Sequence, residues 1–253
     1  GGNNAKRWLM IPGWNTNITY TVGNYGFSLP TDNYRDSSIS TPRIMISVHY
    51  YDPWDFCGEE SSNVTQWGDT ATNSSKISSW GDESALKSQF SSLYNKFVAA
   101  GYPVVIGEYG SIDKSAYDST SAAQRAEFAK KVCTYAKKYG MVPVLWDNGY
   151  TGTYGFGVID RSTCKVTQQK IIDAIASVYP KSSSSNSSNS SASSLEGTYY
   201  IKSSFSGLYL DVANGSASNN ANVQQYTYTG TDRQKFKLVK AVSYTHLTLP
   251  TKA

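Results

Sequence analysis

Four short apolar runs, each followed by polar or aromatic residues, set the pattern of the first 150 residues. The runs cover residues 7–12, 43–48, 104–106 and 141–145. Apolar runs bounded by Gly and Pro indicate strands buried on both faces, as in a parallel sheet. Because parallel strands end at one edge of a sheet, we expect the residues that follow the runs to line a common rim. A carboxylate in that position, Glu108, is a candidate for chemistry.

Helical periodicity fills the stretches that follow the last three runs. Apolar residues recur at intervals of three and four over residues 86–98, 128–139 and 171–179. Asp82 is placed to cap the first helix, and Gly101, Gly140 and Pro180 follow the three helix ends. The segment between the first two runs shows no such period and is predicted to be a long loop. This order of elements predicts right-handed βαβ units.

The number of strands bears on the architecture. A complete (β/α)8 barrel takes about 250 residues, whereas these units supply four strands within residues 1–180. An open four-stranded sheet would expose two apolar edges, which promotes aggregation. We therefore predict an α/β fold in which residues 1–180 form the second half of a (β/α)8 TIM barrel whose first half is absent from the chain.

Composition changes abruptly after Pro180. Residues 181–194 are nearly all Ser and Asn, which predicts a flexible linker. Short β-type runs separated by turns follow in residues 195–241 and predict a smaller all-β module. Residues 242–253 do not continue that pattern and are expected to be a non-native tail.

The charge and hydropathy of the chain narrow the range of partners. A net charge of +4 over 253 residues is small and dispersed, so a nucleic-acid partner is not expected. No apolar run is long enough to predict a membrane span. Cys57, Cys133 and Cys164 match no metal-binding spacing, and any one pair could form a disulfide in an oxidising compartment.

Several motifs in residues 1–180 resemble glycoside hydrolase family 5, most closely its subfamily 4 endoglucanases. The similarity lies in Ser47–Tyr51, in Ile106–Gly110 and in Leu145–Gly149 together with Phe156–Arg161, which occur in the order of that family's strands six, seven and eight. The resemblance implies a retaining endo-β-1,4-glucanase of the cellulase type that hydrolyses plant cell-wall β-glucans. It implies no metal and no cofactor.

The resemblance also assigns roles to individual residues. In a retaining glycosidase, two carboxyl groups about 5 Å apart act as nucleophile and acid/base. Glu108 corresponds to the nucleophile, and His49 and Tyr51 to residues that orient it. A hydrogen bond from Tyr51 would favour the ionised form of Glu108. Contacts with the sugar are expected from Trp146, Asn148, Trp14 and Trp54.

The acid/base residue of this family lies in an Asn-Glu-Pro motif, which this sequence does not contain. Glu59 and Glu60 are the local substitutes, and their simplest interpretation is as solvated loop charges. We therefore expect the chain to be an inactive fragment by itself. Two alternatives stay open: a non-catalytic carbohydrate-binding protein, and a related xyloglucanase, lichenase or mannanase.

Residues 195–241 resemble one repeat of a ricin-type β-trefoil, the fold of carbohydrate-binding module family 13. Residues 234–236 stand at the place of that family's Gln-any-Trp signature. The resemblance implies that Asp211 binds a sugar of the cell wall, that Tyr226 stacks on it and that Gln225 assists. A purely turn-closing role for Asp211 remains open. The linker and the implied substrate together favour a secreted, extracellular protein.

Overall fold

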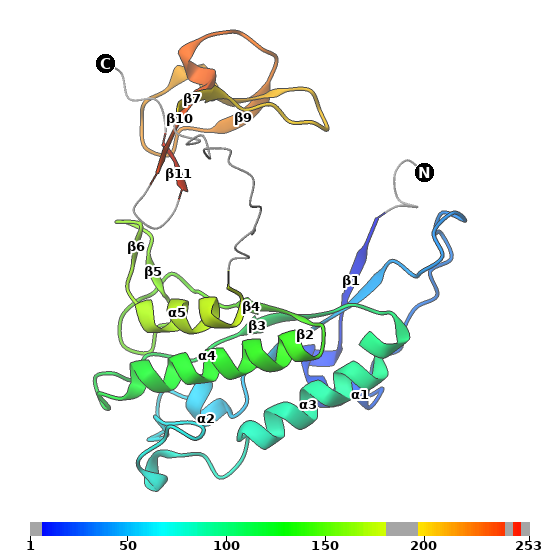
Figure 1. Cartoon of the computed structure of the whole chain (residues 1–253), viewed down its shortest axis with the longest axis vertical. Coiled ribbons are helices and arrows are strands. Elements are labelled where there is room, and N and C mark those ends of the chain that lie inside the picture. Colours follow the sequence, from blue (N-terminus) through cyan, green and yellow to red (C-terminus); the bar gives the residue numbers. More distant parts are fainter. Residues whose placement is uncertain (1–6, 181–196, 241–244, 249–253) are drawn as a thin grey trace, which may run out of the picture. The chain divides into compact units, whose positions relative to one another are not determined.

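The computed structural model describes residues 7–180, 197–240 and 245–248. It divides the chain into two compact units on either side of residue 183. The predicted linker, residues 181–194, lies outside the described residues. The first unit contains a parallel sheet whose four strands follow one another in chain order (Figure 1): β1 (Leu9–Pro12), β2 (Ile44–Tyr50), β3 (Val104–Tyr109) and β4 (Val142–Leu145). These strands confirm the four apolar runs and their parallel arrangement.

Three long helices connect and follow the strands: α3 (Glu83–Lys96), α4 (Ser121–Lys138) and α5 (Gln169–Val178). Helix α4 runs alongside α5 in Figure 1. The predicted cap of α3 is confirmed, because the Asp82 side chain accepts a hydrogen bond from Ala85 N at 2.8 Å. Gly101 adopts a left-handed φ of +86° just past the short helix η4 (Val98–Ala100), as a chain reversal there requires.

Short elements occupy segments in which the sequence predicted loops. The predicted long loop after β1 contains η2 (Trp14–Thr16) and α1 (Ile18–Val22), so the prediction was incomplete there. Helix α1 is too short to show a helical period, and the Asn17 side chain caps it by accepting from Tyr20 N at 3.0 Å. The remaining short elements are α2 (Trp54–Cys57), η3 (Ser74–Lys76), β5 (Ile159–Asp160) and β6 (Lys165–Val166).

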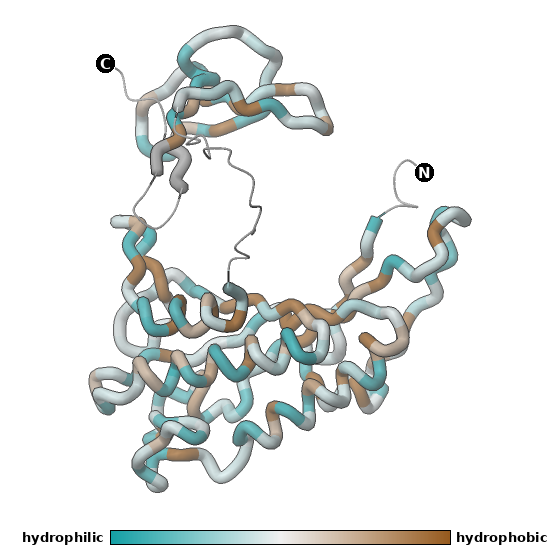
Figure 2. The backbone as a smooth tube through the Cα atoms, viewed as in Figure 1, coloured by the Kyte–Doolittle hydropathy of each residue, from teal (hydrophilic) through white to brown (hydrophobic). Residues whose placement is uncertain are grey.

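The core of the first unit lies between the sheet and the helices. Alternate residues of β2, from Ile44 to Tyr50, are buried there together with Phe90 of α3 and Phe128 of α4. Figure 2 shows hydrophobic residues along β2 and β3 and at intervals along the two helices. The outer strands differ, because Leu9 of β1 and Val142 of β4 are exposed. The predicted exposed edges are thus present in this unit.

The second unit consists of short strands, which confirms the prediction of β structure. Strands β7 (Gly197–Tyr200), β10 (Lys235–Lys240) and β11 (Thr245–Thr248) form one antiparallel sheet, and β8 (Tyr209–Val212) pairs with β9 (Val223–Tyr226). Two short turns of helix are η5 (Ala213–Gly215) and η6 (Asp232–Gln234). Strand β11 falls within the predicted tail. Its four residues nevertheless pair with β10 and take part in the sheet.

Two further observations concern the chain as a whole. Cys57 and Cys133 are buried and Cys164 is exposed, and all three are free thiols, so none of the disulfides that the sequence left open is formed. Among the described helices, none has the length and apolarity needed to cross a bilayer.

Candidate functional site

The carboxylate of Glu108 is the centre of a small polar cluster at the ends of β2 and β3. Its Oε2 accepts a hydrogen bond from the Tyr51 hydroxyl at 2.9 Å. The same oxygen lies 3.4 Å from His49 Nδ1. About a quarter of the His49 side chain and 29% of the Glu108 side chain are exposed to solvent. The structure therefore brings together the three residues that the sequence singled out, with the carboxylate accessible from outside.

A β-bulge places Glu108 on the same face as His49. Strict alternation from Val104 and Ile106, which are buried against the helices, would point Glu108 into the core. Between β2 and β3 the register shifts: Val48 pairs with Ile106, but His49 pairs with Glu108. The extra residue, Gly107, reverses the alternation, and bulges often re-aim side chains in this way beside active sites.

A side chain at position 107 would crowd two residues of β2. A Cβ added at this position would lie 2.7 Å from the Ser47 Oγ and 3.4 Å from the His49 ring. Glycine at this position therefore allows β2 and β3 to approach closely where the bulge forms. A small residue between Ile106 and Glu108 therefore suits this bulge.

Tyr51 is fixed by aromatic contacts on two sides. Its ring meets Trp54 edge to face at a centroid distance of 6.2 Å and Phe156 at 5.9 Å. Burial and the adjacent Glu108 carboxylate raise the pKa of Tyr51 well above its usual value. The phenol therefore remains protonated at all ordinary pH values and remains a hydrogen-bond donor to Glu108.

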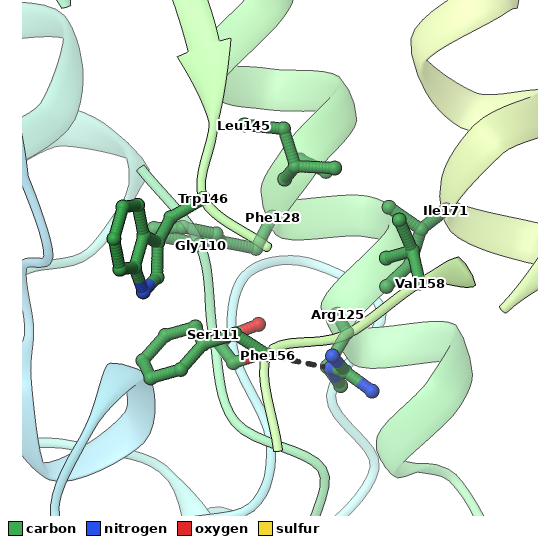
Figure 3. Close-up of a pocket in the computed structure, with 10 residues that line it drawn as sticks. Gly110, Ser111, Arg125, Phe128, Leu145, Trp146, Phe156, Val158 and Ile171 are labelled. Carbon is green, nitrogen blue, oxygen red and sulfur yellow. Dashed lines mark hydrogen bonds between the residues drawn. The ribbon is translucent and has the colours of Figure 1, made fainter. Parts of the chain in front are cut away.

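Trp146 lies directly after β4 and is 40% exposed. Its backbone N–H donates to Tyr109 O at 2.9 Å, which ties it to the residue next to Glu108. Figure 3 shows Trp146 and Phe156 near Gly110 in the small pocket that follows β3 and β4. An accessible indole on the same edge as Glu108 suits contact with an apolar ligand face.

The segment after Trp146 is ordered by two polar side chains. Asp147 accepts hydrogen bonds from Gly149 N at 2.6 Å and Val158 N at 2.9 Å. Asn148 accepts from Tyr150 N at 3.1 Å and from Phe156 N at 3.2 Å. Asn148 is predicted to contact a ligand. Its side-chain carbonyl holds its own loop, which leaves the side-chain NH2 group as the donor for such a contact.

Arg125 of α4 is a buried residue of the site that sequence reasoning missed. Only 1% of its side chain is exposed. Its Nε donates to Ser111 O at 3.0 Å (Figure 3), its Nη2 donates to Gly155 O at 3.4 Å, and Nη1 lies 3.4 Å from Asp113 Oδ2. One guanidinium thus connects the segment after β3 to the segment after β4. The sequence signal was a basic residue on the apolar face of a predicted helix.

Lys114 is a second buried cation that the sequence did not reveal. Its ammonium donates to three backbone carbonyls, those of Asp55, Ser62 and Val64, at 2.8 to 3.1 Å. Burial lowers its pKa. These bonds attach the loop after β2, which carries Trp54, to the segment after β3.

The remaining predicted residues of the first unit are exposed or partly exposed at the surface. Trp14, just after β1, and Trp54, in α2, are about half exposed. Glu59 accepts from Ser61 Oγ at 2.7 Å, and its bonds to Ser61 lower its pKa. A general acid needs a raised pKa, so Glu59 does not fit that role. Glu60 is exposed.

In the second unit, Asp211 and Tyr226 lie on one face of the β8–β9 pair. Asp211 is fully buried, and its Oδ2 lies 3.0 Å from Arg233 Nε, while Gln224 donates to its Oδ1 at 3.1 Å. Tyr226 is about half exposed, with the Arg233 guanidinium 5.2 Å from its ring centroid. Arg233 thus lies against both predicted residues, and the sequence did not predict this partner.

Gln225 points to the other face of the β8–β9 pair, where it accepts from Ser206 Oγ at 2.6 Å. The signature residues Gln234 and Phe236 are fully buried. Gln234 bridges its own loop by donating to Thr227 O and accepting from Thr229 N, both at 2.8 Å. Gln234 and Phe236 therefore act as structural residues of this unit.

Comparison with known proteins gives consistent results for both units. The model of the cellulase family, glycosyl hydrolase family 5, matches residues 2–152, and the model of the ricin-type beta-trefoil lectin domain-like family matches residues 188–252. Endoglucanase A of Paenibacillus barcinonensis is 63% identical over 177 residues, which cover 69% of this chain and 44% of the relative. The chain therefore spans less than half the length of this relative.

Solved structures show the same similarity. A family 5 xyloglucanase from Paenibacillus pabuli, determined in complex with a ligand, is 63% identical, with a TM-score of 0.68 over 70% of this chain and 50% of the other. A Bacteroides ovatus xyloglucanase in complex with a XXXG heptasaccharide is 30% identical, with a TM-score of 0.60 over 70% of this chain and 37% of the other.

Proposed function

Because the chain belongs to the cellulase family, glycosyl hydrolase family 5, we propose that its first unit carries the nucleophile side of a retaining endo-β-1,4-glucanase site. The observation that carries the proposal is the Glu108 carboxylate, which receives the Tyr51 hydrogen bond at 2.9 Å beside His49. The parallel sheet is then one half of a (β/α)8 barrel, with Glu108 at the carboxyl end of a barrel strand.

Glu108 acts as the nucleophile. Its ionised oxygen attacks the anomeric carbon, the bond to the leaving sugar breaks, and a covalent glycosyl-enzyme forms and is then hydrolysed. The Tyr51 hydroxyl donates to the carboxylate and His49 lies beside it, so the two residues hold the carboxylate in one rotamer. Trp146 supplies an aromatic surface for the sugar at this centre.

A retaining site needs a second carboxyl group that protonates the leaving oxygen, about 5 to 5.5 Å from the nucleophile. The family's Asn-Glu-Pro motif does not occur in this sequence. We propose that the acid/base comes from a barrel half joined before Gly1. In the predictions below, the completed enzyme is a protein in which such a half, carrying Asn-Glu-Pro, precedes residues 1–253.

The 253-residue chain expressed by itself is expected to be inactive on β-glucan, since general-acid catalysis contributes about 10²–10⁴-fold. It is also expected to self-associate through the exposed apolar strands β1 and β4. Reducing-sugar release and gel filtration measure the two effects. A monomer that hydrolyses carboxymethylcellulose would contradict this expectation and would direct attention to Glu60.

The glucan that the enzyme prefers can be tested by comparing polysaccharides. The similarity to xyloglucanases makes xyloglucan the first substrate to test. The completed enzyme should release reducing ends from xyloglucan or another β-1,4-glucan, and the first product should retain the β configuration. An inverted product would refute a covalent role for Glu108. Sugar binding without hydrolysis by the completed enzyme would favour the non-catalytic alternative.

Tyr51→Phe tests the hydrogen bond to the nucleophile. A hydrogen bond to a charged group contributes about 1.5–3 kcal/mol, so we expect kcat/KM to fall about 10- to 150-fold. The Phe ring retains the contacts with Trp54 and Phe156, so stability should change little. The measurement is steady-state kinetics on soluble β-glucan. An unchanged kcat/KM would show that this bond does not contribute to catalysis.

We propose further that the second unit binds carbohydrate of the cell wall at the face shared by Asp211 and Tyr226. Tyr226→Ala should reduce retention on sugar, because it removes an exposed stacking ring. Asp211→Ala should reduce retention and also lower stability by about 1–3 kcal/mol, because it leaves Arg233 without its acid. Retention is measured in native gels that contain polysaccharide, and stability is measured by unfolding in urea. Full retention by both variants would contradict the proposal. Because cell-wall polysaccharide lies outside the cell, we propose that the protein is secreted.

A further inference from the structure

Two tyrosines outside the Glu108 cluster stack on each other at the surface of the first unit. Tyr117 lies in the segment after β3 and Tyr154 in the segment after β4. Their ring centroids are 5.7 Å apart and their planes differ by 15°. Tyr117 is 61% exposed. Because both segments leave the carboxyl ends of parallel strands, the pair lies at the same edge of the sheet as Glu108.

The backbone of Tyr154 is held in an unfavourable conformation. Its φ is +65°, in the left-handed region that a bulky side chain rarely adopts. Its N–H donates to Asp113 O at 2.7 Å, and the Asp113 N–H donates to the carbonyl of Gly155 at 2.9 Å. Arg125 donates to the same Gly155 carbonyl. The surrounding bonds thus fix the backbone that carries this ring, and maintained strain of this kind is concentrated at ligand-binding sites.

The loop that presents Tyr154 also forms a wall of the Glu108 site. Phe156, two residues further along the chain, packs edge to face on Tyr51, which donates to Glu108. A rigid segment of three residues therefore connects the stacked pair to the nucleophile. A linear polymer that ran from Glu108 along this loop would reach the pair.

The chemistry of the pair suits a neutral sugar. A tyrosine phenol is uncharged at neutral pH, and interaction with Tyr117 together with burial raises the pKa of Tyr154 further, to about 12. Aromatic faces pack on the C–H faces of pyranose rings, and this contact needs the ring rather than the hydroxyl. Two rings are far too small an area for a protein partner, which needs about 800 Å² on each side.

We propose that Tyr117 and Tyr154 form an outlying subsite that binds a glucose unit of a β-1,4-glucan chain away from the bond being cleaved. The proposal rests on the proposed glucanase function and extends it from the reaction centre to the length of chain that is recognised. The subsite adds affinity for long chains and does not contact the reacting atoms.

The test uses Tyr117→Ala in the completed enzyme, with Tyr117→Phe as the variant that keeps the ring. Tyr34→Ala is the matched control, because Tyr34 is 87% exposed and lies in the segment before β2. An aromatic stacking contact contributes about 0.5–1.5 kcal/mol. The KM for hydroxyethylcellulose, relative to that for 4-nitrophenyl cellobioside, should therefore rise about 2- to 12-fold in Tyr117→Ala and stay unchanged in the other two variants.

Binding provides a second readout that does not depend on turnover. This readout uses the Glu108→Gln enzyme as the parent and native gels that contain hydroxyethylcellulose. Adding Tyr117→Ala should reduce the retardation relative to that parent. Adding Tyr117→Phe should leave the retardation unchanged. If all variants are retarded equally and the enzyme with intact Glu108 is active, the subsite proposal is overturned and the proposed glucanase function stands. An equal rise in KM for the polymer and the short substrate also overturns it, because the residue then acts structurally. A parent enzyme without glucanase activity overturns the proposed function and this proposal together.

Discussion

Glu108→Gln in the completed enzyme is expected to lower kcat on β-glucan by about 10⁴-fold or more, the scale of loss when a covalent nucleophile is removed from a hydrolase. The amide is nearly the same size, but it cannot form the ester bond of the glycosyl-enzyme. The Tyr51 hydroxyl can still donate to the amide oxygen, so the local structure should persist. The measurement is kcat on soluble glucan together with the unfolding midpoint.

Glu127→Gln is the matched control, because Glu127 lies on α4 and pairs at 3.7 Å with Lys131 on the same helix. This control should retain full activity. If Glu108→Gln loses less than tenfold in kcat while the control is unchanged, then Glu108 is not the nucleophile.

Arg125→Met is expected to destabilise the first unit by about 3–5 kcal/mol, because removing one partner of a buried ion pair leaves the other charge uncompensated. The variant removes the donors to Ser111 O and Gly155 O as well as the cation that faces Asp113. Gln168 and Ser115 N remain on Asp113, which limits the loss. The measurement is the free energy of unfolding of the completed enzyme in urea.

Lys130→Met is the control for this experiment. Lys130 lies on the same helix α4 and is exposed, so its replacement should change stability by less than about 0.5 kcal/mol. A loss below about 1 kcal/mol for Arg125→Met would show that Arg125 does not hold the two loops together.

The pattern of apolar residues was sufficient to predict the sheet and the three long helices. Runs such as Val104–Ile106 recur with helical segments between them, and the caps at Asp82 and Gly101 mark boundaries that the structure reproduces. Helix α1 was missed because five residues are too few to show a period. Register shifts were missed for a related reason: the bulge that turns Glu108 toward His49 arises from the pairing of two strands distant in sequence.

Some residues of the candidate site could be predicted from the sequence and others could not. The residue motifs were enough to select Glu108, His49 and Tyr51, which the structure brings into contact. Phe156 and Arg125 were not selected, because their roles depend on loops that meet only in the folded chain. In the second unit, the sequence pointed to Asp211 but could not show that Arg233, 22 residues further along, occupies one of its oxygens.

The central claim is that Glu108 forms the covalent intermediate of a retaining glycosidase. An activated 2-deoxy-2-fluoro cellobioside, which slows hydrolysis of such an intermediate, should inactivate the completed enzyme. Mass spectrometry of the digested protein should then find one fluorinated disaccharide on the peptide that contains Glu108, bound to that residue. Attachment to any other side chain, or enzyme that remains active and unlabelled while it cleaves β-glucan, would contradict the account.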